Sequence, residues 1–257
     1  MVAALFIGAI LFFLVLPTAI VIPMSIGEAG YIEFPPRGLT FEWYVKYFND
    51  ESWMSATWFS LKVAFGTTIT ATLVGTLASL ALVRGDLPGK TLIQSLTLSP
   101  MIIPHIVIAV ALYLFFAPLR LTGNFFGFLI AHSLLAVPYV VLTVSASLQR
   151  FDTTLELAAL SCGANRTQAF IHVILPSIAP GVAAGAVFAF LASFDEATVA
   201  FFISGVEGKT ITRKMFEDID FNLTPVIAAV STVLVAASLV LMTIVHVMQL
   251  RSGKGRD

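Results

Sequence analysis

Two adjacent carboxylic acids, Asp195 and Glu196, are the residues of this sequence best suited to bind a charged solute. They directly follow a segment, residues 167–194, that contains no Asp, Glu, Lys or Arg. If this segment crosses a membrane, an ionised carboxylate costs about 2.5–3.5 kcal/mol at the helix centre and less toward the interface, so a retained acidic pair indicates function. Carboxylates in a partly hydrated cleft attract cations more strongly than they do in bulk water. The alternative is that both acids lie at the membrane interface and cap or solvate the helix end.

Helical geometry limits how this pair can act. Neighbouring residues in a helix point about 100° apart, so we expect at most one of the two acids to face a solute pathway. His105, which follows Pro104 in another apolar segment, is a further candidate for the pathway. A histidine at that depth equally fits a hydrogen bond to a neighbouring backbone carbonyl.

The sequence contains no constellation typical of an enzyme or of a bound cofactor. Its histidines are scattered, and neither His-Glu-x-x-His nor Gly-x-Ser-x-Gly occurs. The single cysteine, Cys162, excludes an internal disulfide, and no Cys/His cluster has zinc-ligand spacing. Segment 85–91, GDLPGKT, resembles a phosphate loop but is one residue short of the Walker A spacing. We therefore expect no catalytic site and no nucleotide, metal or other cofactor site in this chain.

The composition is that of an integral membrane protein. Of the 257 residues, 58% are hydrophobic and 11% are charged, whereas soluble domains are about 45–50% apolar and about 25% charged. The 14 Lys and Arg residues nearly balance the 15 Asp and Glu residues. They form no basic stripe, so we expect no nucleic-acid partner and a lipid membrane as the surroundings of the chain.

Charge-free segments long enough to cross a bilayer, which takes roughly 20 helical residues, occur six times. Lipid offers no hydrogen-bond partners to the backbone, and the segments lack the alternation of a barrel, so we expect six transmembrane helices. The predicted fold class is an all-α integral membrane protein, with a single transmembrane domain over residues 1–257. The spans are expected at about 3–26, 53–83, 91–117, 125–148, 178–203 and 223–250.

Six spans place both termini on the same side of the membrane. Lys and Arg residues in the tail, residues 251–256, directly follow the last span and favour a cytoplasmic location for both termini. The first loop, residues 28–52, is acidic and is therefore expected outside. A short amphipathic helix is predicted within it, with Thr40 as its N-cap.

Segment 150–180 differs from the spans because polar and apolar residues alternate in it. It predicts a short amphipathic helix that stops at Gly163, followed by a second helix that a Leu-Pro break at 175–176 closes. An ordinary cytoplasmic hairpin fits these features. The small residues at 158–159 and Gly163 instead indicate a surface that another protein approaches closely.

This segment resembles the EAA loop of ABC-type import permeases, in which Glu-Ala-Ala, three residues, Gly and nine further residues precede Ile-x-Leu-Pro. The spacing from Gly163 to Val173 matches, although Val173 stands in place of Ile. Leu157 stands where the pattern has Glu, and Glu156 precedes it by one residue. The resemblance implies a cytoplasmic coupling loop at residues 149–177 that docks on an ATPase. The residues implied in coupling are Glu156, Leu157, Ala158, Ala159, Gly163, Ala164, Leu175 and Pro176.

The resemblance extends to most of the chain. The proline-bounded break at 98–104 and the sequence Ser-Phe-Asp-Glu at 193–196 are similar to the spermidine/putrescine-type branch of these permeases. The resemblance implies a type I ABC importer permease fold in a bacterial inner membrane and a polyamine as the solute. Importers of opines, phosphonates or iron complexes are similar in sequence, so another small solute is an alternative. A membrane scaffold or an intramembrane enzyme is the alternative from another class.

The resemblance also implies a set of partners. Two permease subunits form the pore in that family, so this chain would pair with a second permease, most often a related but different chain. Two ATPase subunits bind the EAA loops and hold the ATP and Mg, while an extracytoplasmic solute-binding protein delivers the solute. Closure of the ATPase dimer would move the docked loop and alternate the access of the attached spans. The chain itself would be a transport subunit and not an enzyme.

Overall fold

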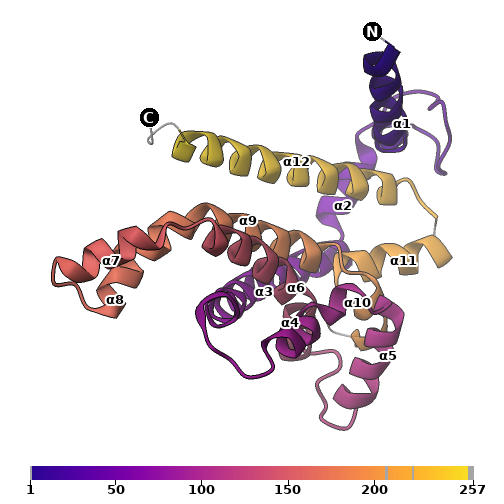
Figure 1. Ribbon diagram of the computed structural model, residues 1–257. Helices are drawn as coiled ribbons and strands as arrows, with labels where there is room; N and C mark the ends of the chain where they lie inside the picture. The colour runs from indigo at the N-terminus through magenta and orange to yellow at the C-terminus, as the bar shows by residue number, and fades with distance from the viewer. Residues whose placement is uncertain (1, 206–207, 222, 254–257) are drawn as a thin grey trace. The chain divides into compact units, whose positions relative to one another are not determined.

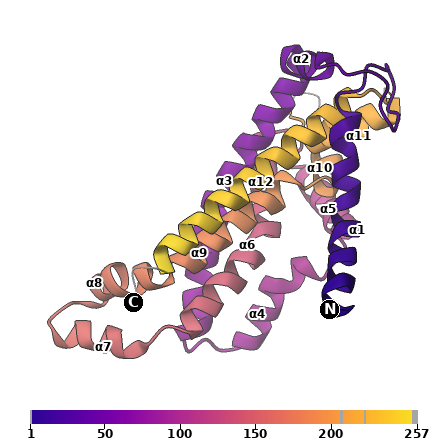
Figure 2. The same cartoon turned by 90° about the horizontal axis from the view of Figure 1, so that it is seen from above.

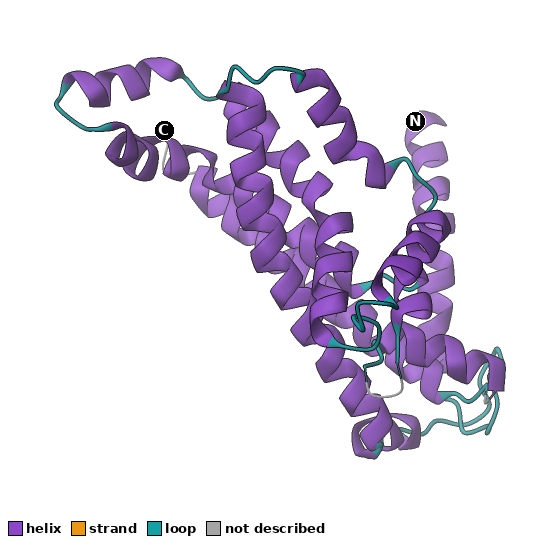
Figure 3. Cartoon of the chain, turned by 90° about the horizontal axis from the view of Figure 1, so that it is seen from below, coloured by secondary structure: helices purple, strands orange, loops and turns teal. Residues whose placement is uncertain are grey.

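Every regular element in the computed structural model is a helix (Figure 3). The structure describes residues 2–205, 208–221 and 223–253, and no strand occurs among them. Helices satisfy every backbone hydrogen bond within their own segment, which a chain this apolar requires in lipid. The predicted all-α fold is therefore confirmed over the described residues.

The described helices fall into two compact units. The first unit comprises Met1–Trp58 and Ile211–Ile244, and the second comprises Phe59–Thr210 and Val245–Asp257. The single domain expected over residues 1–257 stays a prediction.

Five helical segments of the described residues belong to the first unit, and Figure 1 labels the helices that contain them. They are α1 (Val2–Met24), α2 (Glu42–Asn49), the first turns of α3 (Glu51–Arg84), α11 (Ile211–Phe221) and the greater part of α12 (Val226–Gly253).

Helix α2 lies where the amphipathic helix is predicted. Trp43 and Tyr47, one turn apart, are buried on one of its faces. The indole Nε1 of Trp43 donates a 2.7 Å hydrogen bond to the carbonyl of Gly27, which ties α2 to the loop that precedes it. The Thr40 hydroxyl accepts a 3.1 Å hydrogen bond from the amide of Glu42. The N-cap residue is Phe41, whose side chain makes no capping bond, so the prediction of Thr40 as the N-cap is wrong by one residue.

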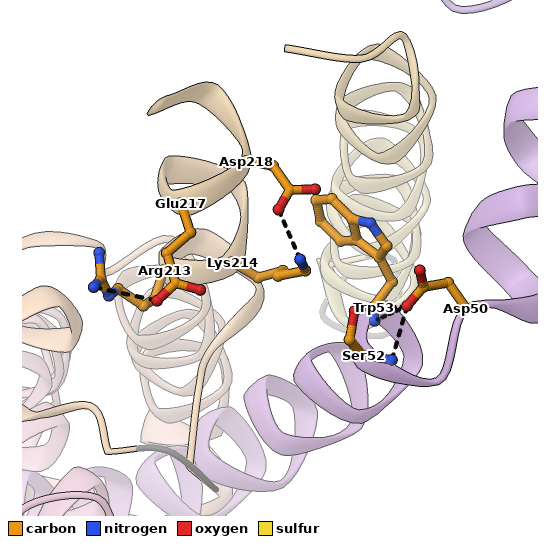
Figure 4. Close-up of polar contacts among 7 residues, drawn as sticks. All are labelled: Asp50, Ser52, Trp53, Arg213, Lys214, Glu217 and Asp218. Atoms are coloured by element: carbon orange, nitrogen blue, oxygen red, sulfur yellow. Dashed lines mark hydrogen bonds and ion pairs between the residues drawn. The ribbon is translucent and has the colours of Figure 1, made fainter. Parts of the chain in front are cut away.

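Polar contacts hold α11 and the start of α3 within the first unit (Figure 4). The Asp50 carboxylate accepts hydrogen bonds from the amide and the hydroxyl of Ser52, at 2.8 and 2.6 Å. The bond from the Ser52 side chain lowers the pKa of Asp50. The Lys214 ammonium donates to Asp218 at 2.6 Å and lies 5.2 Å from the ring centroid of the buried Trp53. The cation–π contact between Lys214 and the buried Trp53 holds α11 against the start of α3.

The second unit contains the remainder of α3 and the elements between residues 90 and 203. These elements are α4 (Lys90–Leu98), η1 (Ser99–Met101), α5 (His105–Phe116), α6 (Phe125–Gln149), α7 (Thr153–Ser161), α8 (Arg166–Ala169), η2 (Phe170–Ile174), α9 (Leu175–Phe194) and α10 (Thr198–Ile203).

Helices α6 and α9 lie side by side along their length in the second unit (Figures 1 and 2). Glycine permits this approach, because a Cβ on Gly185 would lie 3.1 Å from the Cα of Val140 on α6. The contact is sealed by buried apolar residues, among them Val140, Val144, Ile178 and Ala189. Close packing of small residues is the usual way in which membrane helices associate.

Four helices among the described residues are long and apolar enough to cross a membrane. They are Leu5–Met24, Glu51–Arg84, Phe125–Gln149 and Arg166–Phe194. The pair Lys90–Met101 and His105–Phe116 supplies a fifth span if the two count together, and the shorter apolar helix Val226–Val240 falls in the sixth predicted span. The count of six spans stays a prediction.

Two of the predicted spans are interrupted in the structure, and the first of these interruptions falls at the break that the prolines predict. The span at 91–117 is bent by 99° between Met101 and His105, because Pro104 lacks a backbone N–H and disfavours helical geometry in the residue before it. The span at 178–203 is interrupted between α9 and α10 at residues 195–197. The tail used to predict the cytoplasmic termini lies partly outside the described residues, which exclude 254–257.

Candidate functional site

The first helix of the predicted coupling loop, α7, begins and ends at residues suited to those positions. Asp152 is its N-cap, and its carboxylate accepts a 2.9 Å hydrogen bond from the amide of Thr154. Hydrogen bonds from the side chain and then the backbone of Thr154 lower the pKa of Asp152. At the other end Gly163 has a φ of +91°, a conformation that residues with a side chain resist. The amide of Gly163 donates to the carbonyl of Leu160 at 3.0 Å, so the helix ends where the sequence predicts.

The second helix of the loop is also capped, but it does not end at the Leu-Pro pair. Asn165 and Gln168 form a reciprocal capping box, with both bonds at 2.9 Å. The chain then passes through the π-helix η2 directly into α9, whose first turn contains Pro176. The predicted break at 175–176 is therefore wrong. Proline is tolerated in the first turn of a helix, and the wider π-turn before it leaves room for the ring.

The base of the loop is anchored in the apolar cluster of the second unit. Ile174 and Leu148 are buried in this cluster, and Phe151, Phe170 and Leu175 pack against it from the loop. The side chain of Leu175 is therefore a packing anchor, while Pro176 is exposed beside it. Figures 1 and 2 show α7 and α8 as a hairpin beyond this anchored end of α9.

The displaced carboxylate of the loop has a partner inside the chain. Glu156 Oε2 lies 2.6 Å from Nη1 of Arg84, the last residue of α3, and both side chains are about one quarter exposed. The Arg84 guanidinium also lies 5.0 Å from the ring centroid of Phe151. Glu156 therefore faces the body of the second unit, and Leu157 occupies the outward position with 61% of its surface exposed.

The outward face of α7 carries apolar and small side chains. Leu155 is 51% exposed, and Ala158, Ser161 and Cys162 are also exposed, while Ala159 and Ala164 are half-buried on the side of the loop. The role of this face as a docking surface stays a prediction. Six of the predicted coupling residues, Glu156 to Ala159 with Gly163 and Ala164, thus lie on α7 and the turn after it, whereas Leu175 and Pro176 begin α9.

The two acids at the end of α9 have different surroundings. Asp195 is exposed, whereas Glu196 is 6% exposed. The Glu196 carboxylate accepts a 2.8 Å hydrogen bond from the amide of Val199 at the start of α10. Its second oxygen lies 3.1 Å from Nδ1 of His105, whose side chain is 46% exposed. The structure therefore brings His105 and Glu196 together and leaves Asp195 apart from them.

One buried polar pair near the acids is missed by sequence reasoning. His132 on α6 is 1% exposed, and its Nδ1 lies 2.8 Å from the hydroxyl and 3.1 Å from the carbonyl of Ser193. The only available signal is that Ser193 belongs to the same four-residue motif as Asp195 and Glu196. The pair fixes the end of α9 against α6, directly before the acidic break.

The family of the chain follows from its similarity to known proteins. A model of the family described as the binding-protein-dependent transport system inner membrane component matches residues 71–254. The chain belongs to this family. The predicted resemblance to ABC import permeases is thereby confirmed.

Curated members of the family align with nearly the whole chain. The spermidine/putrescine transport system permease protein PotC of Haemophilus influenzae is 30% identical over 232 residues, which cover 90% of each chain. The protein of the same name from Escherichia coli K12 is 32% identical over 238 residues, covering 92% of this chain and 89% of its own. These relatives are permease proteins, as the resemblance implies for this chain.

A solved structure shows the same fold. A crystal structure of a bacterial ABC transporter involved in the import of the acidic polysaccharide alginate superposes with a TM-score of 0.75. It covers 96% of this chain and 94% of its own at 16% identity. The chain therefore has the fold of an ABC importer permease, as the sequence predicts.

Proposed function

We propose that this chain is one half of the solute pathway of an ATP-driven importer for polyamines such as spermidine or putrescine. Membership of the inner-membrane transport family establishes the permease class. The observation that carries the choice of solute is the 30–32% identity to spermidine/putrescine permeases over about nine tenths of both chains. Acidic residues at an exposed helix break suit a solute that carries several ammonium groups.

The partners follow from the same proposal. Two ATPase subunits, which hold ATP and Mg, dock on the coupling loops of this permease and of a second, related permease. A solute-binding protein delivers the polyamine on the outer side of the bacterial inner membrane. The exposed, nearly uncharged face of α7 around Leu157 supports docking, because Glu156 is directed at Arg84 and not at solvent.

The acidic break is the proposed contact of the solute with this chain. Discontinuous membrane helices place polar groups and helix ends near transported solutes, and here the bend before His105 meets the break between α9 and α10. Asp195 is exposed and is the carboxylate that meets an ammonium group. The contact between Glu196 and His105 joins the two breaks, and Glu196 also accepts a hydrogen bond from the amide of Val199 in α10.

The test is transport by the complete complex. The chain is co-expressed with the second permease, the ATPase and the binding protein that neighbouring reading frames encode, and the complex is reconstituted into vesicles. We expect ATP-dependent uptake of labelled spermidine or putrescine, and ATP hydrolysis stimulated by the loaded binding protein. Uptake of an anionic solute in place of every polyamine would overturn the choice of solute. ATP hydrolysis that no binding protein stimulates would contradict the proposal that the chain is a subunit of an importer.

A further inference from the structure

The coupling helix α7 is joined to α3 by a side-chain contact and not by the chain. Glu156, in the first turn of α7, and Arg84, the last residue of α3, are 72 residues apart in sequence. Their ion pair measures 2.6 Å. By the chain itself, α7 connects only to α6 and to α8, through residues 150–152 and 162–165. Any force that α7 transmits to α3 therefore passes through side chains.

The environment of Arg84 suits a stable joint. Its guanidinium is held between the Glu156 carboxylate and the ring of Phe151. Its Nη2 is buried and has no hydrogen-bond acceptor among the described residues, so the group is largely withdrawn from water. Ion pairs that are partly desolvated are screened less by salt than exposed pairs are, and a planar guanidinium loses less freedom than an ammonium when it is held in this way.

The backbone around Arg84 is also held in place. The Lys90 ammonium donates to the carbonyls of Val83 and Gly85, at 3.4 and 3.5 Å, and so satisfies the C-terminal end of α3. Val83 packs against the same apolar cluster as Phe151. Arg84 thus projects from a fixed helix end to Glu156 on α7.

We propose that Arg84 is a positioning residue that makes α3 follow the coupling loop, so that movement of α7 reaches α3 as well as α6 and α9. This inference rests on the proposed function, in which the ATPase moves α7. It also gives a reason for the carboxylate at position 156. At that position it faces Arg84, and the outward position 157 is left to a leucine.

The experiment compares single variants with a charge swap in the reconstituted complex. Arg84→Gln is expected to retain the bound ATPase and its basal hydrolysis, but to lower solute uptake per ATP several-fold. Glu156→Gln is expected to lower solute uptake per ATP to a similar extent. The swapped variant, Arg84→Glu with Glu156→Arg, is expected to restore most of the wild-type ratio of solute uptake to ATP hydrolysis. Lys62→Gln is the matched control, because Lys62 is an exposed cation on the same helix, and it should leave the ratio unchanged.

The outcomes distinguish a failure of the proposed role of Arg84 from a failure of the proposed importer function. A wild-type uptake ratio in both single variants would overturn the role of Arg84, while ATP-driven uptake by the unchanged complex would leave the proposed function intact. If the single variants fail to assemble, the charge swap and the conservative Arg84→Lys variant test the proposed role of Arg84 instead. If the swapped or the Arg84→Lys complex assembles and hydrolyses ATP normally but still takes up little solute per ATP, the proposed role of Arg84 is contradicted. Assembled forms with a near-normal ratio support it.

Discussion

Nδ1 of His105 lies 3.1 Å from the carboxylate of Glu196, and this contact joins two helix breaks of the second unit. His105 begins α5 directly after the bend at Pro104, and Glu196 lies in the break between α9 and α10. Because Glu196 also accepts from the amide of Val199, it has a structural partner on each side. Asp195 has none of these contacts, so the two neighbouring acids are expected to respond differently to substitution.

Removal of the Asp195 charge should impair solute uptake without weakening the fold. Asp195 is exposed, and exposed substitutions change stability by less than about 0.5 kcal/mol. We expect Asp195→Asn to raise the apparent KM for spermidine several-fold at an unchanged melting temperature. Uptake assays at varied solute concentration measure the first effect and thermal unfolding in detergent the second. An unchanged KM for every cationic solute would remove the support for an acidic pathway.

Removal of the Glu196 charge should weaken the fold instead. Its buried carboxylate makes a charge-assisted hydrogen bond to the Val199 amide and contacts His105, and losing such a bond costs about 1.5–3 kcal/mol. The Gln of Glu196→Gln still accepts from the amide, so we expect a loss at the lower end of this range. The KM of the folded fraction should change little. The reverse pattern, with a stable Glu196→Gln variant of raised KM, would identify Glu196 as the solute contact.

Substitution of Gly163 should disturb coupling through the backbone. Apart from Gly163 itself and its two chain neighbours, no atom lies within 4 Å of a Cβ built at this residue, yet its φ is +91°. A side chain in the left-handed region costs about 1–2 kcal/mol, so Gly163→Leu should shift the turn that ends α7. We expect loss of binding-protein-stimulated ATP hydrolysis and of transport, with normal membrane insertion. Gly163→Asn is the control, because Asn tolerates positive φ better, and it should retain part of the activity. A Gly163→Leu complex that transports normally would show that the turn is only a helix stop.

The pH dependence of the α7 start follows from its N-cap. Hydrogen bonds from Thr154 lower the pKa of Asp152 below the ordinary 3.8. A carboxylate with a depressed pKa stabilises the folded helix above the unfolded pKa, and this contribution disappears as the pH falls through the folded value. We therefore expect hydrogen exchange at the first turn of α7 to be independent of pH above about 5 and to speed up, after correction for intrinsic rates, only in strong acid. Asp152→Asn, which still caps but does not titrate, should abolish that acid response. A response that persists in this variant would assign it to another group.

Local sequence patterns predict much of this structure because short-range chemistry determines it. The stop at Gly163 and the bend before His105 each depend on residues within one helical turn. The coupling hairpin is predicted for the same reason. Continuation of the helix through Pro176 is not predictable in this way, because a π-turn upstream makes room for the proline.

Contacts between distant segments are beyond sequence patterns. A 100° separation of Asp195 and Glu196 predicts that their environments differ, but the identity of the buried acid depends on where α5 and α10 bring His105 and Val199. Likewise, nothing in the sequence around Glu156 indicates Arg84 as its partner. The pairing of α6 with α9 brings the loop base to the end of α3, and only tertiary packing specifies that approach.

The native cysteine provides a test of orientation. Cys162 is the single cysteine of the sequence, and it is exposed at the C-terminal end of α7. If the coupling loop faces the cytoplasm, a membrane-impermeant maleimide should label the unmodified protein in inside-out vesicles and not in intact spheroplasts. Cys162→Ser is the blank, and Lys46→Cys in that background should label from the outside, because Lys46 lies on α2 in the predicted outer segment.

Docking of the ATPase on α7 should also change the labelling of Cys162. Cys162 adjoins the exposed face that holds Leu157 and Ala158, so a bound ATPase should shield it from the reagent, and a thiol introduced at position 46 should be unaffected. Leu157→Glu places the carboxylate of the family pattern on this face without disturbing the core, since Leu157 is 61% exposed. If the face docks on an apolar groove, this variant should weaken shielding of Cys162. Labelling of Cys162 only from outside would reverse the topology, and equal labelling with and without the ATPase would place the docking surface elsewhere.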